Sequence, residues 1–361
     1  ILDSVDALYK YVLDKKRAQV VAITGSVGKT TAVGVITDVL KSKYNVLRVY
    51  SKRITPIILK ANLINFLTED IDYIVLEMSI YHKDHVEILS DLLNPDISAL
   101  INIDSSHLEF FDSIDDICIN KASIFRHAKV GFYNNLDEYA KNLSLEAGEL
   151  CYKGELIHKT KMEKLLEIAT DYEVNDDRLI FDNQEIKLFY ASELTMVQMI
   201  LAYKIGVLAE VPKHSIVEAL NNYQPVENRI QKKMAFGKEI IFDGDVTTNE
   251  RIRQLANNNY EKCYLVIRKF GSMENNKRFE KVLDYLERFT KVFIFQDIEY
   301  KEMLKKHPKV EVVKNHNFIN TLDGVIIYHY SGYYRSFEEY DEENLINLEN
   351  EKYKIMKPED I

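Results

Sequence analysis

The chain has 361 residues, of which 46% are hydrophobic and 29% charged, and its formal net charge is −10. This length is enough to bury a sizeable core and suggests two domains, and the composition is that of a soluble globular protein. The acidic balance disfavours a broad nucleic-acid-binding surface, because phosphate contacts need clustered Lys and Arg.

The cysteine spacing and the hydropathy bear on the cellular compartment. Cys118, Cys151 and Cys263 are far apart and form no CxxC pair, which argues against a disulfide framework or a zinc site and favours the cytoplasm. No apolar run approaches the ~20 residues of a membrane span. The opening segment 1–17 mixes charges with apolar residues at helical spacing, unlike a signal peptide. The missing initiator Met is compatible with a fragment or with a processed chain.

Short apolar strands alternate with helical stretches through the first part of the chain. Residues 18–24 (AQVVAIT) are typical of a buried parallel strand, because the run is short, apolar and β-branched. Further strands are predicted at 45–50, 73–77, 97–103 and 130–133, a hairpin at 178–190 turning at 182–184, and helices at 2–12, 30–42, 194–207 and 214–222. This alternation predicts an α/β fold with a P-loop-type, mostly parallel central sheet.

A second, smaller domain is predicted after a boundary near residues 225–229. It is expected to be a Rossmann-like α/β domain at 228–361, following a larger domain at 1–227. Its predicted elements are a hairpin at 232–242 turning at 236–237 and strands at 263–267, 292–295 and 324–328. The acidic stretch 337–361 is expected to lie at the surface.

The run AITGSVGKTT joins a predicted strand to a predicted helix, which is the context of a phosphate-binding loop. Gly25 and Gly28 let the backbone turn its N–H groups toward phosphate oxygens. Lys29 is placed to reach the outer phosphates, and the Thr30 hydroxyl to hold magnesium. The standard P-loop has a Gly where this chain has Ile23, so the loop is a shorter variant.

This loop resembles that of the Mur ligase family, ATP-dependent amide-forming enzymes whose loop has the form Gly-Thr/Ser-x-Gly-Lys-Thr-Thr. Its match here is GSVGKTT, so the resemblance implies that ATP contacts Gly25, Ser26, Val27, Gly28, Lys29, Thr30 and Thr31. Three further blocks follow in the family's order: VLEMS at 75–79, NPDISALINIDSSHLEFFDS at 94–113 and NKAS at 120–123.

The resemblance also implies roles for residues in those blocks. Glu77 would hold magnesium, and a carboxylate at a strand end is suited to a hard cation. Asn102 would lie near the nucleotide, and His107 near a second magnesium. Lys121 matches a lysine that carries a carbamate in many members, which requires a depressed lysine pKa and hence partial burial.

The C-terminal part resembles the family less closely. Arg229 matches an Arg at the domain junction that contacts nucleotide phosphates, which suits its planar fork. Asp243 matches the first residue of a nucleotide-site motif, although the residues after it diverge. Lys277 and Arg278 lie in a loop that would hold the incoming substrate.

Together these matches imply an ATP- and magnesium-dependent ligase that joins a small carboxylate acceptor to an amino acid or dipeptide through an acyl phosphate. The wording at 94–113 is closest to the subgroup that adds D-Ala-D-Ala to a UDP-linked muramoyl tripeptide, a step of peptidoglycan biosynthesis. The roles implied for Lys29, His107, Lys121 and Arg229 are catalytic. The sequence does not indicate the oligomeric state.

Three departures from the family leave alternatives open. Only about 17 residues precede the first predicted strand, the adenine-contacting His-Asn pattern is replaced by ASELT at 191–195, and the Asp243 motif is altered. One alternative is therefore a ligase that extends an amino-acid or folate-like chain without a UDP-sugar. Another is a non-catalytic homologue that binds nucleotide as a partner subunit. A P-loop kinase or GTPase is a third, disfavoured by the lack of an evident NKxD-type motif.

Overall fold

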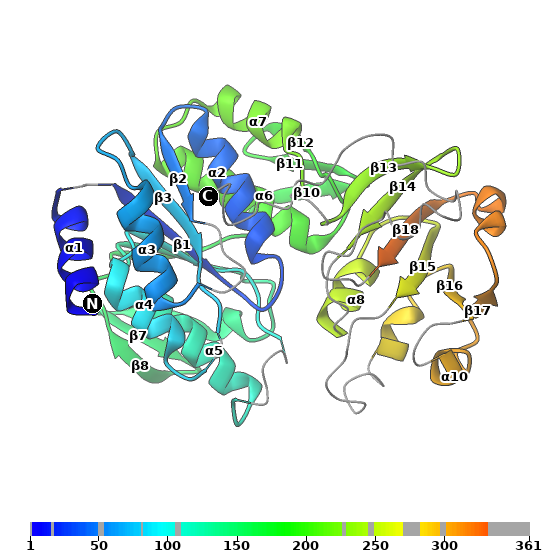
Figure 1. Ribbon diagram of the computed structural model, residues 1–361, viewed down its shortest axis with the longest axis horizontal. Helices are drawn as coiled ribbons and strands as arrows, with labels where there is room; N and C mark the ends of the chain where they lie inside the picture. Colours follow the sequence, from blue (N-terminus) through cyan, green and yellow to red (C-terminus); the bar gives the residue numbers. More distant parts are fainter. Residues whose placement is uncertain are drawn as a thin grey trace. The chain divides into compact units, whose positions relative to one another are not determined.

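The computed structural model describes residues 2–15, 18–49, 54–80, 82–104, 110–225, 229–244, 249–269, 282–296 and 301–330. The chain divides into two compact units, Ile1–Val226 and Glu227–Ile361 (Figure 1). The acidic stretch 337–361, predicted to be a surface segment, lies outside the described residues.

The first unit alternates strands and helices before it adds short antiparallel strands. Its helices are α1 Leu2–Lys15, α2 Lys29–Lys41, α3 Pro56–Phe66, α4 His85–Leu93, α5 Ile114–Ala122, α6 Glu193–Leu208 and α7 Lys213–Asn222. Its strands are β1 Gln19–Thr24, β2 Val46–Val49, β3 Tyr73–Glu77, β4 Ile97–Leu100, β5 Val130–Tyr133, β6 Leu143–Glu146, β7 Glu149–Tyr152, β8 Glu155–Lys159, β9 Lys164–Glu167, β10 Tyr172–Asn175, β11 Arg178–Phe181 and β12 Gln184–Lys187.

A six-stranded parallel sheet in the order β2-β3-β1-β4-β5-β9 forms the centre of this unit. β1 pairs with β3 on one side and β4 on the other, with Ile23 opposite Glu77 and Ala99. The carboxyl ends of the three strands therefore meet at one edge, where ligands bind in open α/β sheets. The predicted α/β fold with a mostly parallel central sheet is confirmed.

Successive residues of the central strands pack into different hydrophobic cores. Val21 and Ile23 of β1 belong to the core formed with α2, α6 and α7, whereas Val20 and Ala22 belong to the core formed with α1, α3, α4 and α5. Successive side chains of a strand point to opposite faces, so a strand covered on both faces has a continuous apolar sequence. Figure 1 shows these helices flanking the sheet.

Two small antiparallel sheets, β6-β7-β8 and β10-β11-β12, complete the unit. The predicted hairpin at 178–190 is β11–β12, and its turn residues Asp182 and Asn183 have φ of 51° and 57°. Positive φ at both central residues matches the right-handed twist of the paired strands.

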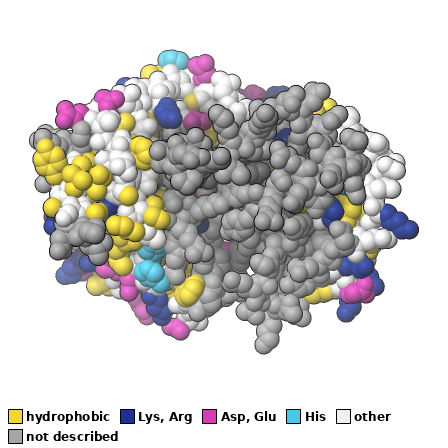
Figure 2. Space-filling view, viewed as in Figure 1, with side chains coloured by type: hydrophobic (Ala, Val, Ile, Leu, Met, Phe, Trp, Pro, Cys, Tyr) yellow, Lys and Arg dark blue, Asp and Glu magenta, His cyan; other side chains and the backbone are white. Residues whose placement is uncertain are grey.

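Within the predicted N-terminal helix, the expected apolar face is only partly buried. Tyr9 is 4% exposed and donates a hydrogen bond to the Leu92 carbonyl, but Leu8 is 46% exposed. Tyr11 of α1 and Ile57 and Phe66 of α3 are also exposed, and Figure 2 shows hydrophobic side chains gathered on the side where α1 and α3 lie.

The second unit has its own six-stranded sheet, in the order β13-β14-β18-β15-β16-β17, in which only the β13–β14 pair is antiparallel. Its strands are β13 Gln231–Ala235, β14 Lys238–Asp243, β15 Cys263–Lys269, β16 Lys291–Phe295, β17 Val310–Val313 and β18 Val325–Tyr330, and its labelled helices are α8 Asn249–Ala256 and α10 Lys301–Leu304. The turn at Phe236 and Gly237 joins β13 to β14 in the predicted hairpin, again with positive φ at both residues.

Among the residues that the structure describes, no helix is long and apolar enough to cross a membrane. The three cysteines are free, and Cys118 and Cys263 are buried while Cys151 is half-buried. Burial raises the pKa of the Cys263 thiol to about 12, so this thiol is an unreactive part of the core.

Candidate functional site: the phosphate loop and its surroundings

The loop between β1 and α2 lies at the carboxyl edge of the parallel sheet. Gly28 precedes α2 with φ of 78° and ψ of 3°, and no side chain caps the helix there. The first intrahelical hydrogen bond is donated by Ala32 to the Gly28 carbonyl at 3.0 Å. The amides of Thr30 and Thr31 precede that bond, and such amides at a helix N-terminus attract anions.

Gly28→Ala is expected to destabilise the first unit by about 1–3 kcal/mol, through strain at positive φ and crowding against α6. A Cβ at Gly28 would lie 2.5 Å from Nε2 of Gln198 and 2.9 Å from Cδ2 of Leu194. Gly154 has φ of 81°, but a Cβ added there would have no heavy atom within 4 Å, so Gly154→Ala isolates the backbone strain. Urea unfolding of both variants measures the difference. Equal destabilisation would contradict the close packing of α6 on the loop.

Asn102 supports the loop from the next strand of the sheet. Its Oδ1 accepts hydrogen bonds from the backbone amides of Ser26 at 2.8 Å and Val27 at 2.9 Å, and its Nδ2 donates to the Val27 carbonyl at 2.9 Å. The Asp104 amide donates to Ser26 Oγ at 2.8 Å. The side-chain amide of Asn102, predicted to lie near the nucleotide, thus contacts the loop itself and holds its shape.

Two lysines converge on a single carbonyl of the loop. Lys29 Nζ donates to the Gly25 carbonyl at 2.9 Å and to the Ser26 carbonyl at 3.0 Å. Lys121 Nζ, from the end of α5, donates to the same Gly25 carbonyl at 2.9 Å. The Lys121 side chain is 1% exposed. Its burial, followed by the nearby charge of Lys29, lowers the pKa of Lys121 well below the ordinary value of a lysine.

Thr30 and Glu77 bring two oxygen donors together beside the loop. The Thr30 hydroxyl donates to Glu77 Oε2 at 2.7 Å, and Glu77 is the last residue of β3. Arg48, which the sequence pattern did not indicate, donates from its guanidinium to the Thr30 carbonyl at 3.2 Å. A hydroxyl and a carboxylate so placed have the oxygen chemistry that magnesium prefers.

Helix α6 contacts the loop through Gln198, another residue that the sequence pattern did not indicate as part of the site. Gln198 is 1% exposed, and its Nε2 donates to the Gly28 carbonyl at 2.9 Å. Ser192 caps α6 by accepting a hydrogen bond from the Thr195 amide at 3.3 Å. The one signal for Gln198 was a polar residue inside the apolar run MVQMILA, since buried polar groups need partners.

In the second unit, Asp243 is enclosed by positively charged or hydrogen-bonding partners. It is 0% exposed, its Oδ2 accepts from Arg251 Nε at 2.9 Å and lies 2.8 Å from His329 Nδ1, and its Oδ1 pairs with the Arg251 guanidinium. Burial alone would raise its pKa, but Arg251 and His329 outweigh this and hold the pKa below its ordinary value. Arg229 is half-buried in the same unit.

Three of the predicted site residues, His107, Lys277 and Arg278, lie outside the described residues. Within the described ranges, no group of three or more His, Cys, Asp or Glu side chains could hold a metal ion. The structure thus brings together Gly25, Lys29, Thr30, Glu77, Asn102 and Lys121 around one loop.

Comparison with known proteins agrees with this arrangement. Residues 23–195 match the family model described as the Mur ligase middle domain. A UDP-N-acetylmuramoyl-tripeptide–D-alanyl-D-alanine ligase of Rickettsia prowazekii is 31% identical over 156 residues, covering 40% of this chain and 34% of the relative. A UDP-N-acetylmuramoylalanine–D-glutamate ligase of Fusobacterium nucleatum is 25% identical over 256 residues, covering 69% of this chain and 55% of the relative.

The chain spans between about a third and just over half of the length of these two curated relatives, at 34% and 55%. The fold also matches the crystal structure of MurF ligase from Thermotoga maritima in complex with ADP. That likeness has a TM-score of 0.70 and 18% identity, covering 91% of this chain and 80% of the other. The family match at 23–195 includes the phosphate loop, Glu77, Asn102 and Lys121. Residues 23–195 of this chain are thus similar to the Mur ligase middle domain.

Proposed function

We propose that this chain is an ATP-dependent ligase that joins a carboxylate to an amine through an acyl phosphate. The observation that carries the proposal is the convergence of Lys29, Lys121 and the Thr30–Glu77 pair on the phosphate loop. The names of its relatives support the same reaction class, since they are ligases of cell-wall precursors and one solved relative holds ADP.

In this proposal the residues of the loop bind and orient the outer phosphates of ATP. The amides of Thr30 and Thr31, at the N-terminus of α2, would donate to phosphate oxygens. Lys29 donates hydrogen bonds to two loop carbonyls. In the complex with ATP it would donate to phosphate oxygens instead. Asn102 keeps the loop in shape by occupying the amides of Ser26 and Val27.

Magnesium fits the oxygen donors present at this edge of the sheet. Thr30 Oγ1 and Glu77 Oε2 are 2.7 Å apart, and both are hard oxygen ligands of the kind that Mg²⁺ uses together with phosphate oxygens. When bound, the ion would neutralise the charge of the outer phosphates. We assign Thr30 and Glu77 to this ion, and His107 and Lys121 to a second one by resemblance.

The covalent steps follow from the ligase class. A carboxylate oxygen of the acceptor attacks the terminal phosphorus, the bond to the bridging oxygen breaks, and ADP leaves. The nitrogen of the amine then attacks the acyl carbon, phosphate leaves, and the nitrogen loses a proton to give the amide. We propose that residues 1–227 bind ATP and that 228–361, with Arg229, Asp243, Lys277 and Arg278, contribute to binding the nucleotide and the amine.

We further propose that Lys121 carries a carbamate in the working enzyme. The reaction with CO₂ needs a neutral amine, and the burial of Lys121 together with the charge of Lys29 lowers its pKa and favours that form. A carbamate would supply a negative charge beside Lys29 and an oxygen ligand for a metal.

Incubation with ¹³C-bicarbonate is expected to give a carbamate carbon signal in the NMR spectrum that Lys121→Arg removes. Lys129→Arg is the matched control, because Lys129 is exposed and its pKa is raised by a hydrogen bond and ion pair with Asp96. A signal that survives Lys121→Arg, or no signal at all, would contradict the carbamate.

The proposed acceptor is a small-molecule carboxylate and the proposed amine an amino acid or dipeptide, as in the relatives. Phosphate release from ATP and magnesium should be measured with a panel of amino acids, dipeptides and carboxylate acceptors, including UDP-muramoyl peptides and folate-like chains. Release that requires both a carboxylate and an amine is the expected result. The requirement for a particular acceptor then distinguishes the cell-wall reaction from a chain-extending ligase.

One observation favours a second candidate, a homologue that binds nucleotide without turnover. Both carboxylate oxygens of Asp243 are engaged by Arg251 and His329, which limits its use as a ligand of the nucleotide. ATP binding without phosphate release, for any pair of substrates in the panel, would support this candidate against the ligase.

A further inference from the structure

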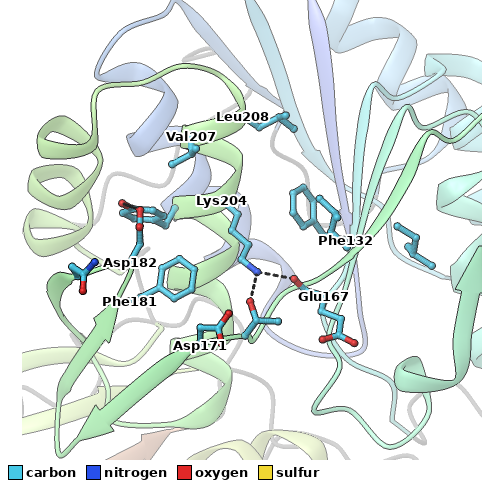
Figure 3. Close-up of a pocket in the computed structure, with 13 residues that line it drawn as sticks. Phe132, Glu167, Asp171, Phe181, Asp182, Lys204, Val207 and Leu208 are labelled. Carbon is cyan, nitrogen blue, oxygen red and sulfur yellow. Dashed lines mark hydrogen bonds between the residues drawn. The ribbon is translucent and has the colours of Figure 1, made fainter.

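A cavity of about 890 Å³ lies in the first unit, away from the phosphate loop (Figure 3). It is bordered by β9, which is the edge strand of the parallel sheet, by the β11–β12 turn and by the last two turns of α6. Its volume is within the range of roughly 300–1,000 Å³ that small-molecule sites occupy. None of the described residues that hold the phosphate loop is among those that line it.

The inner wall of the cavity is aromatic and its mouth is aliphatic. Phe181 and Tyr203 pack edge to face, with ring centroids 5.3 Å apart, and both rings are largely buried. Leu166, Val207 and Leu208 are 37%, 43% and 45% exposed. Exposed aliphatic side chains around a hollow leave apolar surface in water, which an apolar ligand body would cover.

The charged groups on the wall are mostly carboxylates. Glu167, Asp171 and Asp182 line the cavity together with one cation, Lys204. Lys204 Nζ is tied to the wall, because it donates to the Glu167 carbonyl at 2.8 Å and to Thr170 Oγ1 at 3.0 Å, as Figure 3 shows.

The three carboxylates differ in how far they are already engaged. Asp182 accepts a hydrogen bond from the Tyr203 hydroxyl at 2.7 Å and pairs with Lys213 at 2.6 Å. Glu167 accepts one from the Tyr133 hydroxyl at 3.1 Å. Asp171 is exposed, and within the described part of the chain it interacts with the charge of Lys204 but has no direct ion pair or side-chain hydrogen bond. Asp171 is therefore the carboxylate best placed to receive a ligand cation.

We propose that this cavity binds a small amphipathic amine. Its apolar or aromatic body lies against Phe181 and the aliphatic side chains of the mouth, and its ammonium lies against Asp171. Asp171 and Asp182 give the wall two carboxylates against the one ammonium of Lys204, which favours a cation over an anion. This site does not depend on the ligase proposal, because the loop contacts α6 at Gln198 while the cavity uses Tyr203–Leu208.

Phenethylamine is the probe for the test, and 3-phenylpropionate is its anionic counterpart of similar size. Ligand-observed NMR and calorimetry on the full chain are expected to show saturable binding of phenethylamine and none of 3-phenylpropionate. Asp171→Asn is expected to weaken phenethylamine binding about tenfold, because the ligand ammonium loses its charged hydrogen-bond acceptor. Val207→Lys, which places a cation at the mouth, is expected to abolish it.

Asp176→Asn is the matched control. Asp176 is also an exposed aspartate at positive φ, 55° against 50° for Asp171, but it does not line the cavity. The Asp176→Asn variant is expected to bind phenethylamine as tightly as the unaltered chain does. Equal weakening by both Asn variants, preference for 3-phenylpropionate, or no binding of phenethylamine to the folded chain would each overturn the proposal.

Discussion

Lys29→Ala is expected to lower phosphate release by about 10³-fold or more, because a cation on a transferring phosphoryl group contributes on that scale. The side chain now donates to two carbonyls of the loop, at 2.9 and 3.0 Å. Its ammonium therefore already lies at the loop that we propose binds the outer phosphates. Substrate-dependent phosphate release measures the loss, and circular dichroism confirms that the variant is folded.

Lys41→Ala is the control for this variant, since Lys41 is an exposed cation in the last turn of the same helix. It is expected to retain full activity. Loss of activity in both variants would point to a general effect of charge on α2. Retained turnover in Lys29→Ala would contradict the assignment of the phosphate loop as the ATP site.

Arg251→Ala is expected to destabilise the second unit by about 3–5 kcal/mol, which is the cost of leaving a buried charge without its partner. Asp243 is 0% exposed and its carboxylate is bound by Arg251 and His329. Removing the guanidinium would leave the carboxylate in the core with the imidazole but without its permanent positive charge. Urea unfolding, followed by a probe in this unit, measures the change.

Lys262→Ala is the comparison for the buried pair, because Lys262 forms an exposed pair with Asp323 in the same unit. Exposed pairs contribute little, so this variant is expected to unfold like the unaltered chain. A similar loss of unfolding free energy in both variants would contradict a larger contribution from the buried Asp243–Arg251 pair than from the exposed pair.

The same pair predicts a dependence of stability on pH. Burial raises the pKa of Asp243, but the partners outweigh it and the net pKa is depressed. The stabilisation is therefore fully present above the ordinary aspartate pKa of about 3.9 and is lost as the pH falls through the depressed value. In Arg251→Ala, the free energy of unfolding should therefore depend less on pH in the acid range than in the unaltered chain. Urea unfolding at several acid pH values measures this, and an unchanged pH dependence would contradict the assignment.

The central strands β1 and β3 were predictable because each contains a continuous apolar run. A strand covered by helices on both faces has no polar face, and β1 and β3 are such strands. Strands β9 and β10 were not predicted, since KLLE and YEVN are four residues long and partly exposed, and no distinct pattern marks so short a strand. Strand β17, with the sequence VEVV, was missed for the same reason of length.

The part of the site whose residues are contiguous in the sequence was predictable. The loop and the residues directly after it, including Lys29 and Thr30, are contiguous with a strand and a helix. The contact of Asn102 with the loop, 76 positions away from Ser26, and that of Gln198 with Gly28, 170 positions away, depend on strand order and helix packing. Spacing along the chain does not specify these distances, so the partners became evident only in the folded chain.

We propose that ATP activates a carboxylate at this loop. The most direct test is to supply an acceptor labelled with ¹⁸O in its carboxylate, together with ATP and magnesium and the amine that supports phosphate release. If an acyl phosphate forms, one ¹⁸O from the acceptor must appear in the released phosphate, and mass spectrometry is expected to find it there. Phosphate released without the label would come from hydrolysis by water, and that result would contradict the ligase mechanism.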